Sequence, residues 1–137
     1  MTSVPSSTEP IAVVRTKRPV FLDPRHIQLP IGALASIGHR ISGIVLALGV
    51  PVFVYLLASS LENEQSFARV ASQLRVVPVK AALVVLVWAL SHHVLAGVRH
   101  LLSDFDIGSP LQSARRSAWF VNVGGVALAV LATVVLW

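Results

Sequence analysis

Three long apolar blocks, separated by short polar segments, dominate the hydropathy pattern of this chain. Formal charges are absent from three stretches, residues 41–61, 81–98 and 117–137. A helix needs about 20 consecutive apolar residues to cross the hydrocarbon core of a bilayer. The pattern therefore predicts an all-α membrane protein. Its three transmembrane helices are expected over about 31–58, 77–103 and 117–137.

The polar segments set the predicted organisation around these helices. Residues 1–30 contain five prolines and no apolar run, so we expect an N-terminal segment preceding a three-helix anchor over 31–137. Residues 59–75 read as a polar loop, and residues 104–116 as a turn with Gly108 and Pro110 as helix breakers. Pro51 predicts a kink inside the first helix.

Composition and charge exclude several functions. Charged residues make up 12% of the chain, against about 25% in soluble domains. Cysteine is absent, so disulfides, thiolate metal sites and cysteine nucleophiles are excluded. The net charge of +5 comes from cations that mostly flank the apolar blocks. This distribution indicates contact with lipid headgroups rather than nucleic acid.

The distribution of Lys and Arg predicts the orientation. Six cations lie on the side of the N-terminus and the second connection, namely Arg15, Lys17, Arg18, Arg25, Arg115 and Arg116. Three lie on the opposite side, namely Arg69, Arg75 and Lys80. The positive-inside rule therefore places the N-terminus in the cytoplasm.

Ionisable residues inside membrane spans are costly, and here they concentrate on the first two helices. At 100° per residue, His93, Gly97, His100 and Asp104 form one stripe on the second helix. An imidazole can ligate iron, and a glycine one turn later lets a flat macrocycle approach. A single histidine in a membrane helix is also commonly an interhelical hydrogen-bond donor. His92 and Arg99 form a second stripe.

The first helix carries a polar stripe of Ser36, Arg40 and Gly43, with His39 beside it. A hydroxyl and a guanidinium can hydrogen-bond a quinone carbonyl or haem propionates. Snorkelling of Arg40 to the interface is the alternative explanation. The first helix starts where the second ends, so both stripes fall in the same half of the membrane. On the third helix, Gly124 and Gly125 predict close packing, and Asn122 predicts an interhelical hydrogen bond.

Three motifs resemble the cytochrome b556 subunit family, the membrane anchors of bacterial succinate dehydrogenase (respiratory complex II). They are RPVFLD at 18–23, SIGHRISG at 36–43 and HHVLAGVRHLLSDF at 92–105. The resemblance covers the chain from about Arg18 to its end.

The resemblance implies a subunit that is not catalytic alone. It would sit in the bacterial inner membrane beside a second three-helix anchor, an iron–sulfur subunit and a flavoprotein subunit carrying FAD. Electrons from succinate would pass through these subunits to ubiquinone. Haem b would be shared between the two anchors. His93 matches the axial ligand of the haem iron, with His92 as a rival. Ser36 and Arg40 match residues of the quinone-binding site. The residues that match the surroundings of the haem propionates are His39, Arg40 and His100.

Two other functions are compatible with the pattern. The chain can be a structural anchor without haem, in which the histidines only hydrogen-bond between helices. A small ion or substrate carrier is the third hypothesis, which the uncharged third helix disfavours. A second three-span protein with an intramembrane histidine, encoded nearby, would favour the haem-binding function.

Overall fold

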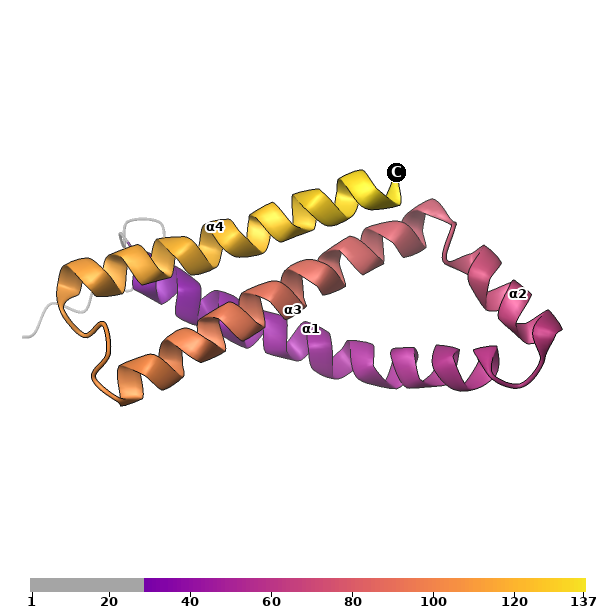
Figure 1. Cartoon of the computed structure of the whole chain (residues 1–137), viewed down its shortest axis with the longest axis horizontal. Helices are drawn as coiled ribbons and strands as arrows, with labels where there is room; N and C mark the ends of the chain where they lie inside the picture. Colours follow the sequence, from indigo (N-terminus) through magenta and orange to yellow (C-terminus); the bar gives the residue numbers. More distant parts are fainter. Residues whose placement is uncertain (1–28) are drawn as a thin grey trace, which may run out of the picture.

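A computed structural model describes residues 29–137 of the chain. These residues form four helices and no strand, and Figure 1 shows their arrangement. The helices are α1 (Ile31–Ser60), α2 (Glu64–Gln73), α3 (Val77–Asp104) and α4 (Leu111–Leu136). The predicted N-terminal segment 1–30, with four of the cations used for the orientation, lies almost wholly outside the described residues.

The three predicted spans are confirmed as helices. α1, α3 and α4 are each long and apolar enough to cross a membrane. A helix of this length reaches about 40–45 Å, so its ends extend past the hydrocarbon core of about 30 Å. The N-terminus of α1, the end of α3 and the start of α4 lie at one end of the bundle (Figure 1).

The prediction of a long turn before the third span was wrong. α4 begins at Leu111 rather than Ser117, directly after Pro110, which takes the N-cap position with an extended backbone. Proline has a fixed φ and no backbone N–H. It is therefore favoured at the start of a helix, where the N–H groups have no acceptor within the helix. The turn itself needs Gly108, whose φ of +83° disfavours any other side chain.

The polar loop 59–75 is also corrected, because most of it is the short helix α2. Asn63 caps this helix: its side-chain oxygen accepts a hydrogen bond of 2.8 Å from the Ser66 amide. Asparagine followed by a polar–apolar pattern of period 3.6 is a helix-start signal. α2 spans the gap between the diverging ends of α1 and α3 (Figure 1).

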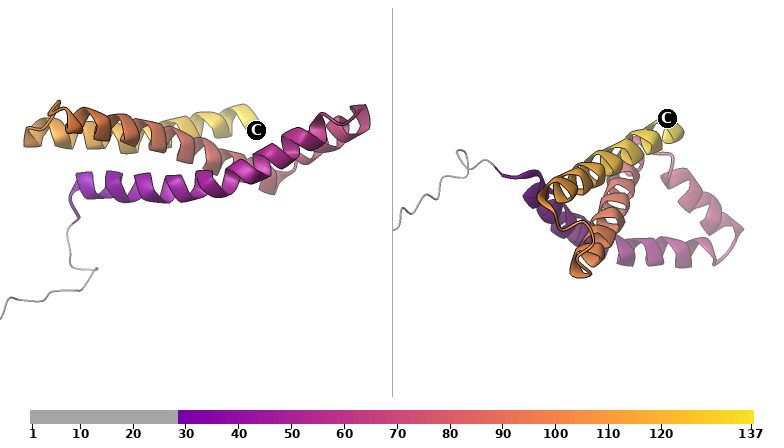
Figure 2. Two further views of the ribbon diagram at one scale, coloured as in Figure 1. Left: turned by 90° about the horizontal axis from the view of Figure 1, so that it is seen from below. Right: turned by 60° about the vertical axis from the view of Figure 1, so that its left-hand side comes forward.

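Pro51 lies inside α1 without interrupting it. The helix bends along its course, as the left-hand view of Figure 2 shows. Proline removes one backbone hydrogen bond and clashes with the preceding turn, which accounts for a bend at this part of the helix.

Small residues line the contacts between the long helices. The buried positions recur at spacings of three and four on two helices, with Ala89, His92 and Ala96 on α3 and Ala118, Val121 and Gly125 on α4, and at a spacing of seven on α1, with Ala35 and Ser42. Small side chains let helix backbones approach closely, which is how membrane helices gain packing energy. α3 packs against both α1 and α4.

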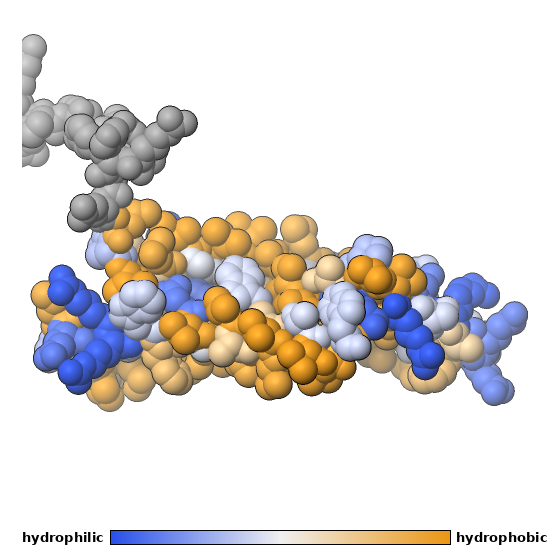
Figure 3. All heavy atoms as spheres, turned by 90° about the horizontal axis from the view of Figure 1, so that it is seen from above, coloured by the Kyte–Doolittle hydropathy of each residue, from blue (hydrophilic) through white to orange (hydrophobic). Residues whose placement is uncertain are grey.

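Large apolar side chains cover the outside of the bundle. Leu48, Phe53 and Val135 are all more than 60% exposed. Apolar atoms occupy much of the middle of the molecule, and hydrophilic residues gather at its two ends (Figure 3). This inverted distribution is stable in lipid, which matches the apolar surface.

Candidate functional site

Three histidines from two helices meet on the α1–α3 contact. The imidazoles of His39 and His93 stack with ring centroids 4.2 Å apart and planes 20° from parallel. The His100 ring lies 5.3 Å from the His39 ring and is tilted against it. The structure therefore brings together three of the residues predicted from the two stripes.

Hydrogen bonds fix the orientation of the His93 ring. Its Nδ1 atom is 3.2 Å from the carbonyl oxygen of His39 and 3.3 Å from the hydroxyl of Ser42. The Ser42 hydroxyl donates its proton to the same carbonyl at 2.9 Å. Both neighbours of Nδ1 are thus acceptors, so Nδ1 carries the proton of the neutral ring and Nε2 carries the lone pair.

The Nε2 atom of His93 is left open. It makes no hydrogen bond within residues 29–137, and among the described residues the single buried polar side-chain atom without a partner is His92 Nδ1. The His93 residue as a whole is half-buried, so it is not enclosed by the helices of this chain. An accessible, unprotonated imidazole nitrogen can bind a metal ion.

Glycines make room for this cluster. A Cβ atom on Gly43 would lie 3.1 Å from Cε1 of His93, a tight contact. A Cβ on Gly97 would lie 3.7 Å from Nε2 of His39, so the His39 ring occupies the space beside this glycine. The expected role of Gly97, to let a flat macrocycle approach, therefore stays a prediction, because His39 lies in that space here.

His92 has a different environment from its neighbour. It is 2% exposed and lies among all three long helices. A Cβ on Gly38 of α1 would lie 2.6 Å from the His92 ring, and a Cβ on Gly125 of α4 would lie 3.2 Å from the Cβ of His92. The ring of His92 is therefore enclosed between the helices of this chain.

Asn122 on α4 is the polar partner of His92. Its amide nitrogen donates to the Ala118 carbonyl at 2.8 Å, which turns its oxygen toward His92 Nε2 at 3.4 Å. The predicted interhelical hydrogen bond of Asn122 is therefore confirmed. Close packing at the paired glycines is confirmed as well, since Leu95 and His92 lie against Gly124 and Gly125.

Other predicted residues lie near the cluster without joining it. Ser36 and Arg40 share α1 with His39 but make no hydrogen bond within the described residues, and Arg40 is exposed. Asp104 is the exposed last residue of α3 and makes no hydrogen bond or ion pair with a histidine within the described residues.

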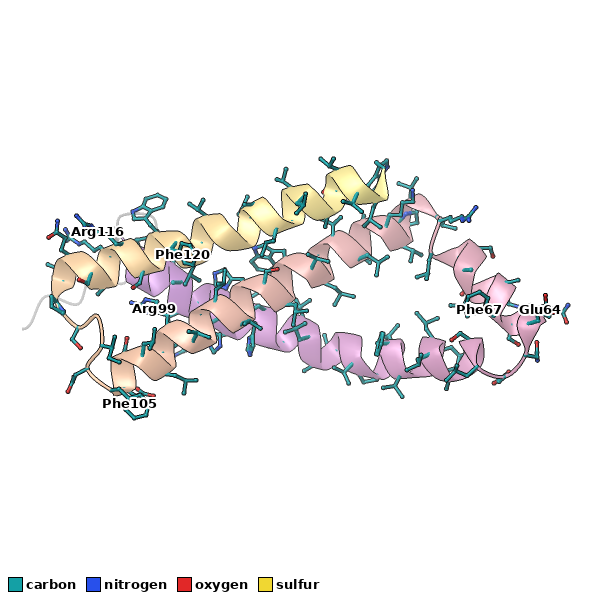
Figure 4. All side chains as sticks on the ribbon, in the orientation of Figure 1. Glu64, Phe67, Arg99, Phe105, Arg116 and Phe120 are labelled. Carbon is teal, nitrogen blue, oxygen red and sulfur yellow. The ribbon has the colours of Figure 1, made fainter. Side chains whose placement is uncertain are left out.

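Arg99 turns toward α4. Its Nε donates to the Ser117 hydroxyl at 3.2 Å, and a Cβ on Gly32 of α1 would lie 3.7 Å from its Nη2. Figure 4 shows Arg99 at the same end of the bundle as Phe105 and Arg116, far from Glu64 and Phe67 on α2.

Two residues that shape the site, Gly38 and Ser42, were not predicted from the sequence. The predicted polar stripe on α1 contains Ser36, Arg40 and Gly43. The contact of α1 with its neighbours instead runs along Ala35, Gly38 and Ser42. A search for small residues at spacings of three and four would have found this stripe.

Comparisons with known proteins agree with these features. The family described as succinate dehydrogenase/fumarate reductase transmembrane subunit matches residues 14–136. The succinate dehydrogenase cytochrome b556 subunit of Coxiella burnetii is 37% identical over 125 residues, which cover 90% of this chain and all of the relative. The protein of the same name from Paracoccus denitrificans is 32% identical, covering 91% of this chain and 96% of the relative. A mouse relative, the mitochondrial succinate dehydrogenase cytochrome b560 subunit, is 37% identical over 72% of this chain and 57% of its own length.

Proposed function

The chain belongs to the succinate dehydrogenase/fumarate reductase transmembrane subunit family, and we propose that it anchors a succinate:quinone oxidoreductase in the membrane. In this complex His93 supplies one axial ligand to haem b. Ser36 and Arg40 form part of the quinone site. The haem, when bound, accepts and returns single electrons. The chain's own residues would hold the haem and orient it.

The observation that carries the haem assignment is the contrast between two adjacent histidines. The Nδ1 atom of His93 faces two acceptors, so in the neutral ring Nε2 carries the lone pair, and this atom makes no hydrogen bond within the described residues. His92 is enclosed by Gly38 and Gly125 and directs Nε2 at Asn122. Metal-bound histidines generally donate their other ring proton to a carbonyl or similar acceptor. His93 has this arrangement and His92 does not.

A haem at this position requires ligands from beyond this chain. Within residues 29–137, no group of three or more His, Cys, Asp or Glu side chains is arranged to hold a metal. A single accessible imidazole fits a haem iron, which takes four ligands from the porphyrin and a second axial ligand from another chain. We propose that a histidine of a second three-helix anchor provides that ligand.

The polar neighbours of His93 suit the edge of a haem. His39 and His100 lie on the side of His93 that approaches the end of the bundle where α1 begins and α3 ends. Together with Arg40 they provide donors and positive charge for propionate carboxylates. We expect the His39 ring to shift from its stacked position when the macrocycle binds beside Gly97.

Ser36 and Arg40 would serve the quinone. Both lie on one face of α1, four residues apart. Neither side chain makes a hydrogen bond with another described residue. A hydroxyl and a guanidinium can donate hydrogen bonds to a quinone carbonyl and stabilise the negative charge that develops on reduction. We propose that the iron–sulfur subunit and the second anchor close this site, and that the flavoprotein subunit with FAD supplies the electrons.

We further propose that the complex lies in the bacterial inner membrane with the N-terminus of this chain in the cytoplasm. The cations near the start of α4, Arg115 and Arg116, support this orientation, as do those in residues 1–28. The histidine cluster and Ser36 then lie in the cytoplasmic half, close to the soluble subunits.

A haem-free structural anchor is the second candidate. It is supported by the same contacts, because the stacked His39 and His93 rings and the His92–Asn122 pair join helices without a metal. In that case His93→Ala would weaken packing but remove no chromophore.

A reduced-minus-oxidised visible spectrum of the complex that copurifies with this chain separates the two candidates. We expect a b-type α-band at about one haem per chain. His93→Ala should abolish the band while FAD remains in the complex, and His92→Ala should retain it. An intact complex without the band would favour the structural anchor, and loss of the band in His92→Ala alone would move the ligand to His92.

A further inference from the structure

Ser42 is buried beside His93 in a way that its local hydrogen bond does not explain. Its side chain is 0% exposed, and its hydroxyl donates to the His39 carbonyl within α1. Serine in a membrane helix commonly satisfies its hydroxyl by such a bond. Ser60 has the same bond, to the Leu57 carbonyl at 2.7 Å, at an exposed position near the other end of α1. Ser42 differs because His93 Nδ1 from α3 lies 3.3 Å from its oxygen.

The hydroxyl and the carbonyl act together on His93. The Ser42 proton is directed at the His39 carbonyl, so its oxygen presents a lone pair to Nδ1. The His39 carbonyl also accepts from Nδ1, at 3.2 Å. Gly43 leaves the space in which the ring stands. Two acceptors on one side of the ring hold both its tautomer and its rotation.

We propose that Ser42 is a positioning residue for the haem ligand: its buried hydroxyl, with the His39 carbonyl, holds the His93 ring in one orientation with the proton on Nδ1 and the lone pair on Nε2. This inference rests on the proposed function, because it names what orients the ligand of that same site. Ser42 itself touches neither the haem nor the quinone.

The consequence is a more basic Nε2. An acceptor on Nδ1–H increases electron density on the ring and strengthens binding of the metal at the other nitrogen. Because a more basic ligand favours ferric over ferrous iron, loss of the Ser42 acceptor is expected to raise the haem midpoint potential. Removal of such a partner typically lowers metal affinity by about 10- to 100-fold.

The test compares three variants of the whole complex in mild detergent. Ser42→Ala removes the acceptor, Ser42→Thr restores a hydroxyl that can make the same bond within the helix, and Ser60→Ala removes the equivalent bond far from the site. Haem retained per FAD after washing, and the midpoint potential from an optical redox titration, are measured for each.

We expect Ser42→Ala to retain less haem and to show a raised potential, and Ser42→Thr and Ser60→Ala to match the unmodified complex. An unchanged potential and haem content in Ser42→Ala would overturn the inference. If Ser42→Ala loses all haem, the threonine variant decides: restored haem supports the inference, and equal loss in an assembled complex contradicts it. If the haem content depends on His93 but does not change in Ser42→Ala, the inference about Ser42 is wrong and the proposed function stands. If the unmodified complex contains no haem, both the inference and the proposed haem-binding function are wrong.

Discussion

The ring of His92 occupies the space that Gly38 leaves open on the neighbouring helix. A Cβ atom on Gly38 would come within 2.6 Å of Cε1 and 2.7 Å of Nε2 of this ring. Because His92 also lies against Gly125 and is almost fully buried, it cannot move aside without displacing α4. The three long helices are therefore held together at one histidine.

Gly38→Ala should consequently destabilise the bundle. Overpacking a close contact typically costs about 1–3 kcal/mol, and we expect a lower midpoint in thermal unfolding of the purified complex. Gly32→Ala is the matched control, since its new Cβ would lie at an ordinary 3.7 Å from Arg99. His92→Ala should partly restore the stability of Gly38→Ala by removing the clashing ring. Equal effects of Gly32→Ala and Gly38→Ala would contradict this packing.

Asn63 should control the stability of α2. Its side chain accepts from the Ser66 amide and satisfies one of the free donors at the helix start. Asn63→Ala removes this cap, at a typical cost of about 1 kcal/mol, so the amides of α2 should exchange with deuterium faster by about five-fold. Asn63→Asp keeps an acceptor and should exchange like the unmodified protein. Unchanged exchange in the alanine variant would show that packing against α1 alone holds this helix.

Lys80 joins the beginning of α3 to the end of α4. Its ammonium donates to the Leu136 carbonyl at 2.6 Å and lies 5.3 Å from the centre of the Trp137 ring. A cation stabilises the free carbonyls at a helix C-terminus. Lys80→Met keeps the long side chain but removes the charge, so the last turn of α4 should fray.

Amide exchange over the last turn of α4 measures this effect. Hydrogen bonds to charged groups contribute about 1.5–3 kcal/mol, which predicts exchange faster by roughly ten-fold or more in Lys80→Met. Arg75→Met, which changes an exposed cation at the same end of the bundle, serves as the control. Similar exchange in both variants would mean that Lys80 is held in place without stabilising α4.

The sequence predicted the helices more accurately than their contacts. Uncharged apolar runs defined α1, α3 and α4, because the bilayer imposes length and composition directly on each span. α2 and the early start of α4 depend on caps at Asn63 and Pro110, which a hydropathy pattern does not register.

The candidate site was only partly accessible to the same reasoning. The stripe containing His93, Gly97 and His100 follows from helix geometry alone, and its meeting with His39 followed from antiparallel topology. Helix geometry also put His92 on a separate stripe from His93. The burial of His92 did not follow, because it depends on which face of α3 meets Gly38 and Gly125. The contact of Ser42 with His93 likewise depends on the register between α1 and α3, which a single sequence does not reveal.

Ser36 and Arg40 provide the sharpest test of the quinone site, because both side chains are uncommitted within the described residues. Ser36→Ala and Arg40→Leu each remove one donor group from the proposed site without breaking a side-chain hydrogen bond within the described residues. A charge-assisted hydrogen bond contributes more than a neutral one, so we expect succinate–quinone activity to fall by roughly 100-fold in Arg40→Leu and roughly ten-fold in Ser36→Ala.

The two activities of the complex separate a lost quinone site from failed assembly. Reduction of an artificial dye by the soluble subunits should remain within about two-fold of the unmodified complex in both variants, since those subunits would be intact. Arg40→Lys retains charge but not the planar donor pair, and an intermediate activity would indicate that guanidinium geometry matters. Ser60→Ala, on the same helix but remote from this face, should leave both activities unchanged. A parallel fall of quinone and dye reduction in Arg40→Leu would assign Arg40 to docking of the soluble subunits instead of quinone binding.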